Sequence, residues 1–186
     1  MQSIFRERSI GCLMEISGLV DLYERKDPSF LQRVMAWLSE SEKAFAQLRH
    51  PFAAFPAAQR AQILAAREGL RDAGTENTRH QRKIAPIAAA QALSRMEEEL
   101  RDQVSSLDEI FEDAKGKIAQ LLVIASAVAP LSAPEGRERQ IWLEEIWARL
   151  GEASEARALY LYLNASLAKV DRLYLLNEIV RQWFDE

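Results

Sequence analysis

The stretch from Ile87 to Val128 contains no proline, and it constrains the fold of this chain more than any other feature. From Leu100 onward its apolar residues recur at alternating intervals of four and three positions, which places them on one face of an α-helix. They are Leu100, Val104, Leu107, Phe111, Ala114, Ile118, Leu121, Ala125 and Val128. Met96 and Leu93 continue this seam toward the N-terminus. A helix this long needs other helices along its apolar face, so the pattern predicts a central helix with a coiled-coil seam.

The remainder of the chain supplies those partners, and no strand pattern extends over more than a few residues. Asp27-Pro28 is typical of a helix start, because aspartate caps free N–H groups and proline fits the first helical position. The other helices are expected at 3–25, 28–49, 56–74, after a capping box at 132–135 and up to Gly151, and at 154–184. In the first of them the expected buried stripe is Leu13, Ile16, Val20 and Tyr23. We therefore predict an all-α fold, a helical bundle of about six helices around one long central helix, as a single domain spanning residues 1–186.

Composition and charge restrict the compartment and the classes of partner that we expect for this chain. With 186 residues, of which 48% are hydrophobic and 28% charged, it can bury a real core. The net charge of −4 gives no general attraction to nucleic acid or to anionic membranes. Cys12 is the one cysteine, so no intrachain disulfide can form and a reducing compartment, the cytoplasm, is expected. The most apolar run, 118–128, is shorter than the roughly 20 residues that cross a bilayer, so we expect no membrane span.

No group of residues points to catalysis or to metal binding. The two histidines, His50 and His80, both lack the glutamate three positions earlier that metal-binding helical bundles use. Cys12 lies in an apolar helix and is typical of a buried thiol rather than a nucleophile. A glycine-rich phosphate loop and a nucleophile elbow are both missing. We therefore predict no catalytic residue, no metal and no cofactor, and the chain is more consistent with a binding protein than with an enzyme.

Two charged clusters have alternative interpretations. The acidic one lies off the seam of the long helix and is expected to be a solvated face, or else a docking face for a basic partner. It comprises Glu97, Glu98, Glu99, Asp102, Asp108, Glu109, Glu112 and Asp113. The basic one could meet phosphates, but acidic residues lie among its members and aromatic side chains for base stacking are missing, so nucleic acid is not the expected partner. It comprises Arg67, Arg71, Arg79, His80, Arg82 and Lys83.

The helix expected at 154–184 carries two apolar stripes. The first follows the four–three spacing and comprises Leu159, Leu163, Ser166, Val170, Leu173, Asn177, Val180 and Phe184. The second, formed by Leu176, Ile179 and Trp183, faces partly another way. One neighbouring helix buries one stripe, so either the chain's own helices cover both or a second chain covers one. Leu176, Ile179 and Trp183 are therefore the candidate interaction surface.

These observations favour a non-catalytic helical protein–protein interaction module: an adaptor, a chaperone-like partner or an assembly subunit. Its partner would be another protein or a second copy of the chain. Two other classes remain open. One is a helical bundle that binds a small ligand or cofactor, with or without catalytic activity, and the other is a nucleic-acid-associated regulator.

Overall fold

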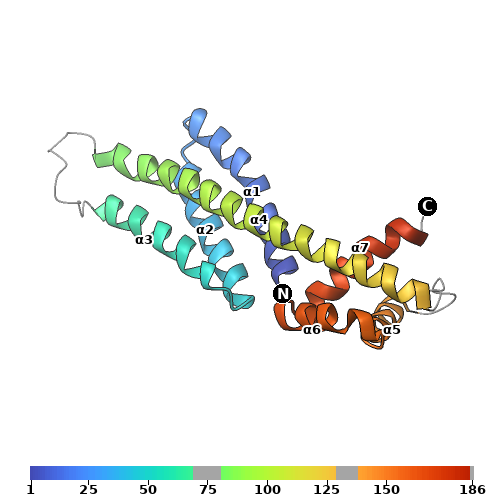
Figure 1. Cartoon of the computed structure of the whole chain (residues 1–186). Coiled ribbons are helices and arrows are strands. Elements are labelled where there is room, and N and C mark those ends of the chain that lie inside the picture. Colours follow the sequence, from blue (N-terminus) through green and yellow to red (C-terminus); the bar gives the residue numbers. More distant parts are fainter. Residues whose placement is uncertain (69–80, 129–137, 185–186) are drawn as a thin grey trace. The chain divides into compact units, whose positions relative to one another are not determined.

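The computed structural model describes residues 1–68, 81–128 and 138–184, and within them the chain is all-α, with no strand (Figure 1). It contains seven α-helices and two short 3-10 helices over the described residues. Their bounds are α1 Gln2–Glu24, α2 Phe30–Gln47, η1 Pro51–Ala53, α3 Ala54–Glu68, α4 Gln81–Val128, α5 Arg139–Leu150, η2 Ser154–Ala156, α6 Arg157–Ser166 and α7 Lys169–Phe184. The predicted all-α architecture with one long central helix, α4, is confirmed.

Internal packing separates the chain into two compact units. The N-terminal unit comprises Ile4–Ser105, and the C-terminal unit comprises Met1–Ser3 together with Ser106–Glu186. Helix α4 contributes residues to both units. The prediction that residues 1–186 form a single domain remains a prediction.

The apolar seam of α4 is buried as expected. Its members in both units are at most 8% exposed: Leu93, Met96, Leu100, Leu107, Phe111, Ala114, Ile118, Leu121 and Ala125. Val104 is partly buried, and the side chain of Val128 lies outside the described residues. Coiled-coil geometry along this seam remains a prediction. The helix begins earlier than expected, at Gln81, so Pro86 lies inside it. Proline removes a single backbone donor, and near a helix end that loss is small enough for the helix to continue.

The N-terminal unit is built from α1, α2, α3 and the first part of α4. Asp27 stabilises the turn that precedes α2: its Oδ1 accepts hydrogen bonds from the Ser29 backbone N–H at 2.7 Å and the Ser29 hydroxyl at 2.6 Å. The helix itself begins at Phe30, with Ser29 as its N-cap, two residues later than predicted. The aromatic rings of Phe5, Phe45 and Phe52 pack together, with centroids 4.9–5.7 Å apart. This cluster lies in the buried core of the N-terminal unit.

The buried face of α1 differs from the expected stripe. Leu13 is partly buried and Ile16 is buried, but Val20 is 37% exposed and Tyr23 41% exposed. The face that packs inward is instead formed by Phe5, Ser9, Ile16 and Leu19. Ser9 satisfies its hydroxyl within the helix by donating to the Phe5 carbonyl at 2.9 Å, so a polar residue is tolerated on the inner face. A stripe chosen by apolar character alone therefore points to the wrong side of this helix.

The C-terminal unit surrounds the second part of α4 with α5, α6 and α7, and its core is continuous. The single helix expected at 154–184 is wrong. It is divided into η2, α6 and α7, and Leu167 between α6 and α7 has an extended backbone, with φ −122° and ψ 141°. The Ser166 hydroxyl donates to the Tyr162 carbonyl at 2.9 Å, so its polar group is satisfied at the end of α6. The break places the Leu167 side chain, 6% exposed, in the core.

Candidate functional site

The predicted interaction surface is not available at the surface of the C-terminal unit. Leu176 is 0% exposed and Ile179 7% exposed, and both belong to the core that α7 shares with α4 and α5. The side chain of Trp183 lies outside the described residues. Because the chain's own helices cover Leu176 and Ile179, a second copy would have to use other residues in this conformation. Self-association itself stays a prediction.

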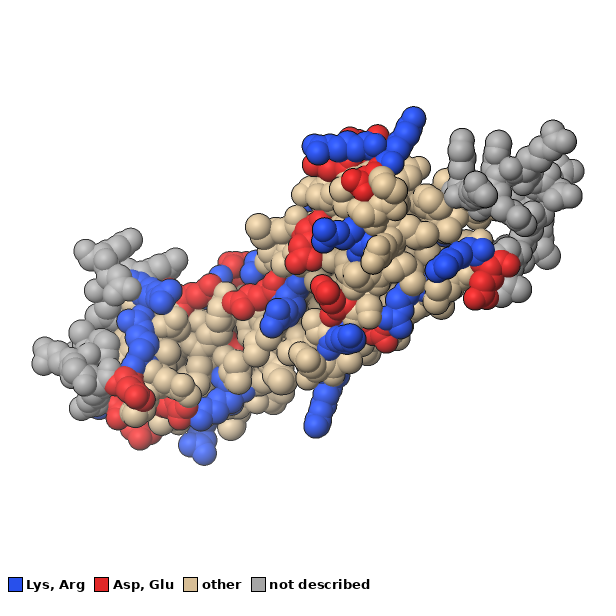
Figure 2. All heavy atoms as spheres, turned by 180° about the vertical axis from the view of Figure 1, so that it is seen from behind, with Lys and Arg blue, Asp and Glu red and all other residues tan. Residues whose placement is uncertain are grey.

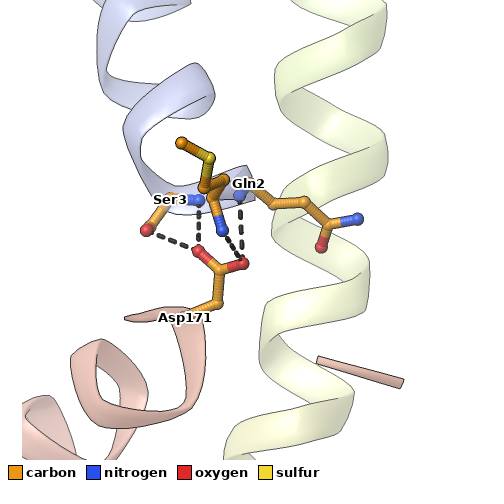
Figure 3. A network of polar contacts seen from close by, with 4 residues as sticks. Gln2, Ser3 and Asp171 are labelled. Carbon is orange, nitrogen blue, oxygen red and sulfur yellow. Dashed lines mark hydrogen bonds and ion pairs between the residues drawn. The ribbon is translucent and has the colours of Figure 1, made fainter. Parts of the chain in front are cut away.

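The first turn of α7 is anchored by Asp171. This side chain is 1% exposed, and its carboxylate meets residues from the start of the chain (Figure 3). Oδ1 accepts hydrogen bonds from the Ser3 backbone N–H at 2.9 Å and the Ser3 hydroxyl at 2.6 Å. Oδ2 accepts from the Gln2 backbone N–H at 3.0 Å and from the Met1 amine. The carboxylate thus satisfies N–H groups that have no partner within α1 itself.

The environment of Asp171 also sets its charge. Burial by itself raises the pKa of the carboxyl, but the hydrogen bonds from the Met1 amine, the Ser3 hydroxyl and two backbone amides outweigh it. The pKa of Asp171 therefore lies below its ordinary value, and the group is ionised at neutral pH. A charged acceptor that receives this set of donors fixes the first turn of α7.

The residue after Asp171 is Arg172, whose guanidinium has hydrogen-bond donors that are not satisfied within the described part of the chain. Arg172 extends over the Trp147 ring, with Cζ 5.2 Å from the ring centroid. Its Nε and Nη1 atoms are buried and have no hydrogen-bond partner among the described residues. An unpaired buried donor costs roughly 1–3 kcal/mol, so a guanidinium in this state favours any acceptor that reaches it.

Arg172 lines a cleft of about 250 Å³ in the C-terminal unit. Helices α5, α6 and α7 supply its walls, which are formed by Glu144, Trp147, Ala148, Tyr160, Asn164, Lys169, Arg172 and Leu173. We call this site the Arg172 cleft. Its volume lies below the roughly 300–1,000 Å³ of pockets that enclose drug-sized ligands. The space therefore suits a single side chain or chain terminus better than a cofactor.

The walls of the Arg172 cleft are held by their own contacts. The Trp147 indole N–H donates to Oδ1 of Asn164 at 3.3 Å, and the Asn164 amide donates to the Tyr160 carbonyl at 2.9 Å. The Tyr160 ring lies 5.5 Å from the Trp147 ring and directly against Gly151. A Cβ atom at Gly151 would approach Tyr160 Cε1 to 2.7 Å. Gly151, expected only as a helix end, is thus also needed for the close approach of this ring.

A second cation stands at the same cleft. Lys169 forms an ion pair with Glu144 of α5 at 2.9 Å. The Lys169 hydrogen bond, followed by that of Gln140, lowers the pKa of Glu144, so this carboxylate remains charged at neutral pH. With Lys169 and Arg172 positive and Glu144 negative, the three groups carry one net positive charge.

A second cleft lies in the N-terminal unit and has a volume of about 440 Å³. His50, Phe52 and Phe55 contribute aromatic walls, while Glu99 and Gln103 contribute polar ones. The His50 ring stacks on Phe5 at 3.7 Å, its Nδ1 accepts from the Phe52 N–H at 3.3 Å, and burial lowers its pKa. Glu99 accepts from Gln103 at 3.1 Å. The polar groups of this cleft are therefore occupied by one another or by backbone.

The other candidate residues from the sequence do not gather into one site in the described part of the chain. Over the described residues, no three His, Cys, Asp or Glu side chains gather in a way that could hold a metal ion. Cys12 lies 3.6 Å from the Ser41 hydroxyl, and burial raises its pKa, so it is a thiol at neutral pH. No helix in the part of the chain that the structure describes is long and apolar enough to cross a membrane.

The two charged clusters behave differently. The acidic residues of α4 are partly or fully exposed, and several pair locally, as in Glu97 with Arg101 at 2.6 Å and Asp113 with Lys117. Most of the basic cluster lies outside the described residues: Arg71, Arg79 and His80 entirely, and Arg82 and Lys83 in their side chains. On the face drawn in Figure 2, basic and acidic side chains are interspersed. This face presents no continuous basic surface of the kind that follows a phosphate backbone.

Sequence reasoning did not identify Asp171, Lys169 or Arg172 as functional residues. Each is an ordinary charged side chain in a helical context, and the partners of Asp171 and Arg172 lie 168–170 and 25 positions away in the sequence. Trp147 is 8% exposed, and it also lines the cleft. Comparison with protein-family models, curated proteins and solved structures gives no match for this chain.

Proposed function

We propose that this chain is a non-catalytic helical module that binds another protein, and that the Arg172 cleft is a point of contact. The observation that carries this proposal is the guanidinium of Arg172, held over Trp147 with two buried nitrogens that have no acceptor in the part of the chain that the structure describes. The cleft offers hydrogen-bond donors and one net positive charge. Such an arrangement can recognise an anionic group on a partner.

The size and walls of the site support a protein partner over a small molecule. A cleft of about 250 Å³ admits one side chain or chain terminus, and most of the contact area would then lie outside it. Arginine and aromatic residues are the types most enriched at the energetic centres of protein interfaces. The absence of disulfide chemistry is consistent with action in the cytoplasm, which we include in the proposal.

A photo-crosslinking experiment in the native host tests this proposal. A photoreactive amino acid replaces Ala148, which is exposed and lines the Arg172 cleft, and a matched control carries it at Glu152, which is exposed outside the cleft. We expect one defined protein product from position 148 alone, and its loss when Arg172→Gln is added. A crosslinked second copy of the chain would identify self-association as the interaction. The same background products from both positions, unchanged by Arg172→Gln, would refute the proposal.

One observation favours a second function, binding of a small ligand. The cleft beside His50 has about 440 Å³ and aromatic walls, which is within the size range of ligand pockets. Ligand binding there would perturb the packing of Phe52 and Phe55. A ligand that co-purifies with the chain and is displaced by Phe55→Trp would establish this function in place of protein recognition.

A further inference from the structure

We propose that the Arg172 cleft recognises a carboxylate of the partner protein, presented by an aspartate or glutamate side chain or by a chain terminus. This inference rests on the proposed function, and it specifies the chemistry of the contact. It begins from Arg172, whose planar guanidinium matches the two oxygens of a carboxylate and can bind them side by side.

Charge balance selects a singly charged ligand. Lys169 and Arg172 face the cleft as cations, and Glu144, paired with Lys169 at 2.9 Å, is the facing anion. Asp171 adds nothing to this balance, because its carboxylate is buried against Gln2 and Ser3. A carboxylate therefore brings the site to neutrality. A doubly charged phosphate monoester would leave an excess negative charge near Glu144, which is unfavourable in a partly enclosed space.

The guanidinium of Arg172 is held in place before a ligand binds. A single carboxylate that enters this small cleft can therefore anchor a partner. The Trp147 ring supports the guanidinium from one face, and the hydrogen bond from Trp147 to Asn164 at 3.3 Å fixes the ring. Asp171 fixes the turn on which Arg172 stands. A cation that is already oriented loses little conformational freedom when it binds, so more of the interaction energy appears as affinity.

The same geometry shows how Nε and Nη1 of Arg172 stay without an acceptor among the described residues. Glu144 is the acidic residue lining the cleft, and its carboxylate bonds to Lys169 and to Gln140 at 3.4 Å. Within the described ranges Nε and Nη1 of Arg172 have no acceptor, and in this inference the partner supplies it. A carboxylate that enters from a partner would complete an alternating arrangement of two cations and two anions.

Fluorine NMR on the full chain labelled with 5-fluorotryptophan tests the inference. The Trp147 signal is assigned by its loss in Trp147→Phe. The probes are an acetylated and amidated tetrapeptide with one glutamate, the same peptide with glutamine, a glutamine peptide with a free C-terminus, a phosphoserine peptide, and acetate. We expect saturable shifts of the Trp147 signal with the glutamate peptide, with a dissociation constant on the order of millimolar, as suits one anchor group. The glutamine peptide with both ends blocked should cause none.

Three variants make the test specific. Arg172→Gln should weaken binding of the glutamate peptide at least tenfold, and Arg172→Lys should weaken it severalfold because the fork geometry is lost. Arg149→Gln removes the same charge from an exposed position of α5 and should leave binding unchanged. If Arg172→Gln does not fold, as judged by circular dichroism, Arg172→Lys decides the outcome.

The probes separate the possible sources of the carboxylate. A preference for the glutamate peptide indicates a side chain, and a preference for the free C-terminus indicates a chain end; both support the inference. Equal shifts with the blocked glutamine peptide, tighter binding of phosphoserine, or acetate binding as tightly as either peptide would overturn it. Failure of all peptides while the crosslink at position 148 persists would refute the carboxylate alone. Loss of both results would refute the proposed function as well.

Discussion

Replacement of Asp171 by asparagine is the most direct test of how the first turn of α7 is held. The carboxylate accepts four hydrogen bonds, from the Met1 amine, the Gln2 and Ser3 amides and the Ser3 hydroxyl. Asparagine has the same shape but only one acceptor oxygen, and its NH₂ group would face donors. Hydrogen bonds to a charged group contribute about 1.5–3 kcal/mol each, while the amine of the exposed Met1 can return to water. We expect Asp171→Asn to lower the free energy of unfolding by about 2–4 kcal/mol at neutral pH.

The pH dependence of this loss distinguishes the charge of Asp171 from its shape. Because the folded-state pKa of Asp171 lies below the value of about 3.9 in an unfolded chain, its contribution is fully present above that value. The contribution is lost as the pH falls through the folded-state pKa, where the native carboxylate becomes protonated. Asparagine does not titrate. The difference between wild type and Asp171→Asn should therefore be constant near neutral pH and shrink below about pH 3.9.

Urea unfolding followed by circular dichroism at several pH values measures both effects. Asp102→Asn is the matched control, since it makes the same replacement at an exposed position and should change the free energy of unfolding by less than about 0.5 kcal/mol. Two results would refute the reasoning: a loss for Asp171→Asn no larger than that of the control, or a large loss that is the same at acidic and neutral pH.

Three further predictions follow from particular contacts. Gly151→Ala should lower stability by about 1–3 kcal/mol because its Cβ would meet the Tyr160 ring, whereas Gly116→Ala, with open space beside it, should raise stability by up to about 1 kcal/mol; urea unfolding compares the two signs. Since burial lowers the pKa of His50, stability should fall as the pH drops below about 6.5, and a pH profile that His50→Gln leaves unchanged would contradict this. If residues 1–186 are one domain, fluorine signals of Trp37 and Trp147 should be lost at the same urea concentration, and separate midpoints would show that the two units unfold independently.

The seam of α4 could be predicted because it depends on helix periodicity alone. A residue such as Leu100 or Ile118 is buried whichever helices surround it, since the four–three spacing already places it on the inner face. The region in which α2 begins was equally local, because the Ser29 N–H donates to Asp27 two positions away, although the helix itself begins at Phe30. The start of α4 was not, because proline at position 86 is compatible either with a helix start or with the early part of a helix.

The division of the last helical region could not be found from sequence pattern. No proline or glycine lies near Leu167, and the apolar spacing continues across the break. The break coincides with burial of Leu167 in the core and with the bond from the Ser166 hydroxyl to the Tyr162 carbonyl. Ser166 was counted as a member of a continuous stripe, although serine is also a residue whose side chain competes for backbone groups. The candidate surface at Leu176 and Ile179 rests on the same assumption of one continuous helix; both side chains are buried within the C-terminal unit, and pairing with another chain stays a prediction.

The break between α6 and α7 is also what creates the Arg172 cleft. A straight helix over 154–184 would hold Asn164 and Arg172 at a fixed separation along one axis, but the extended Leu167 lets α6 and α7 take different directions. Asn164 on α6 and Arg172 on α7 can then approach Trp147 of α5 from two sides. A helix break without glycine or proline leaves backbone groups to be satisfied and loses helix hydrogen bonds. Asp171 and Lys169, bonded to Ser3 and Glu144, supply compensating contacts at this point. The stability of the turn and the orientation of the free cation thus come from the same few residues, so a change that loosens the anchor should also disorder the binding group.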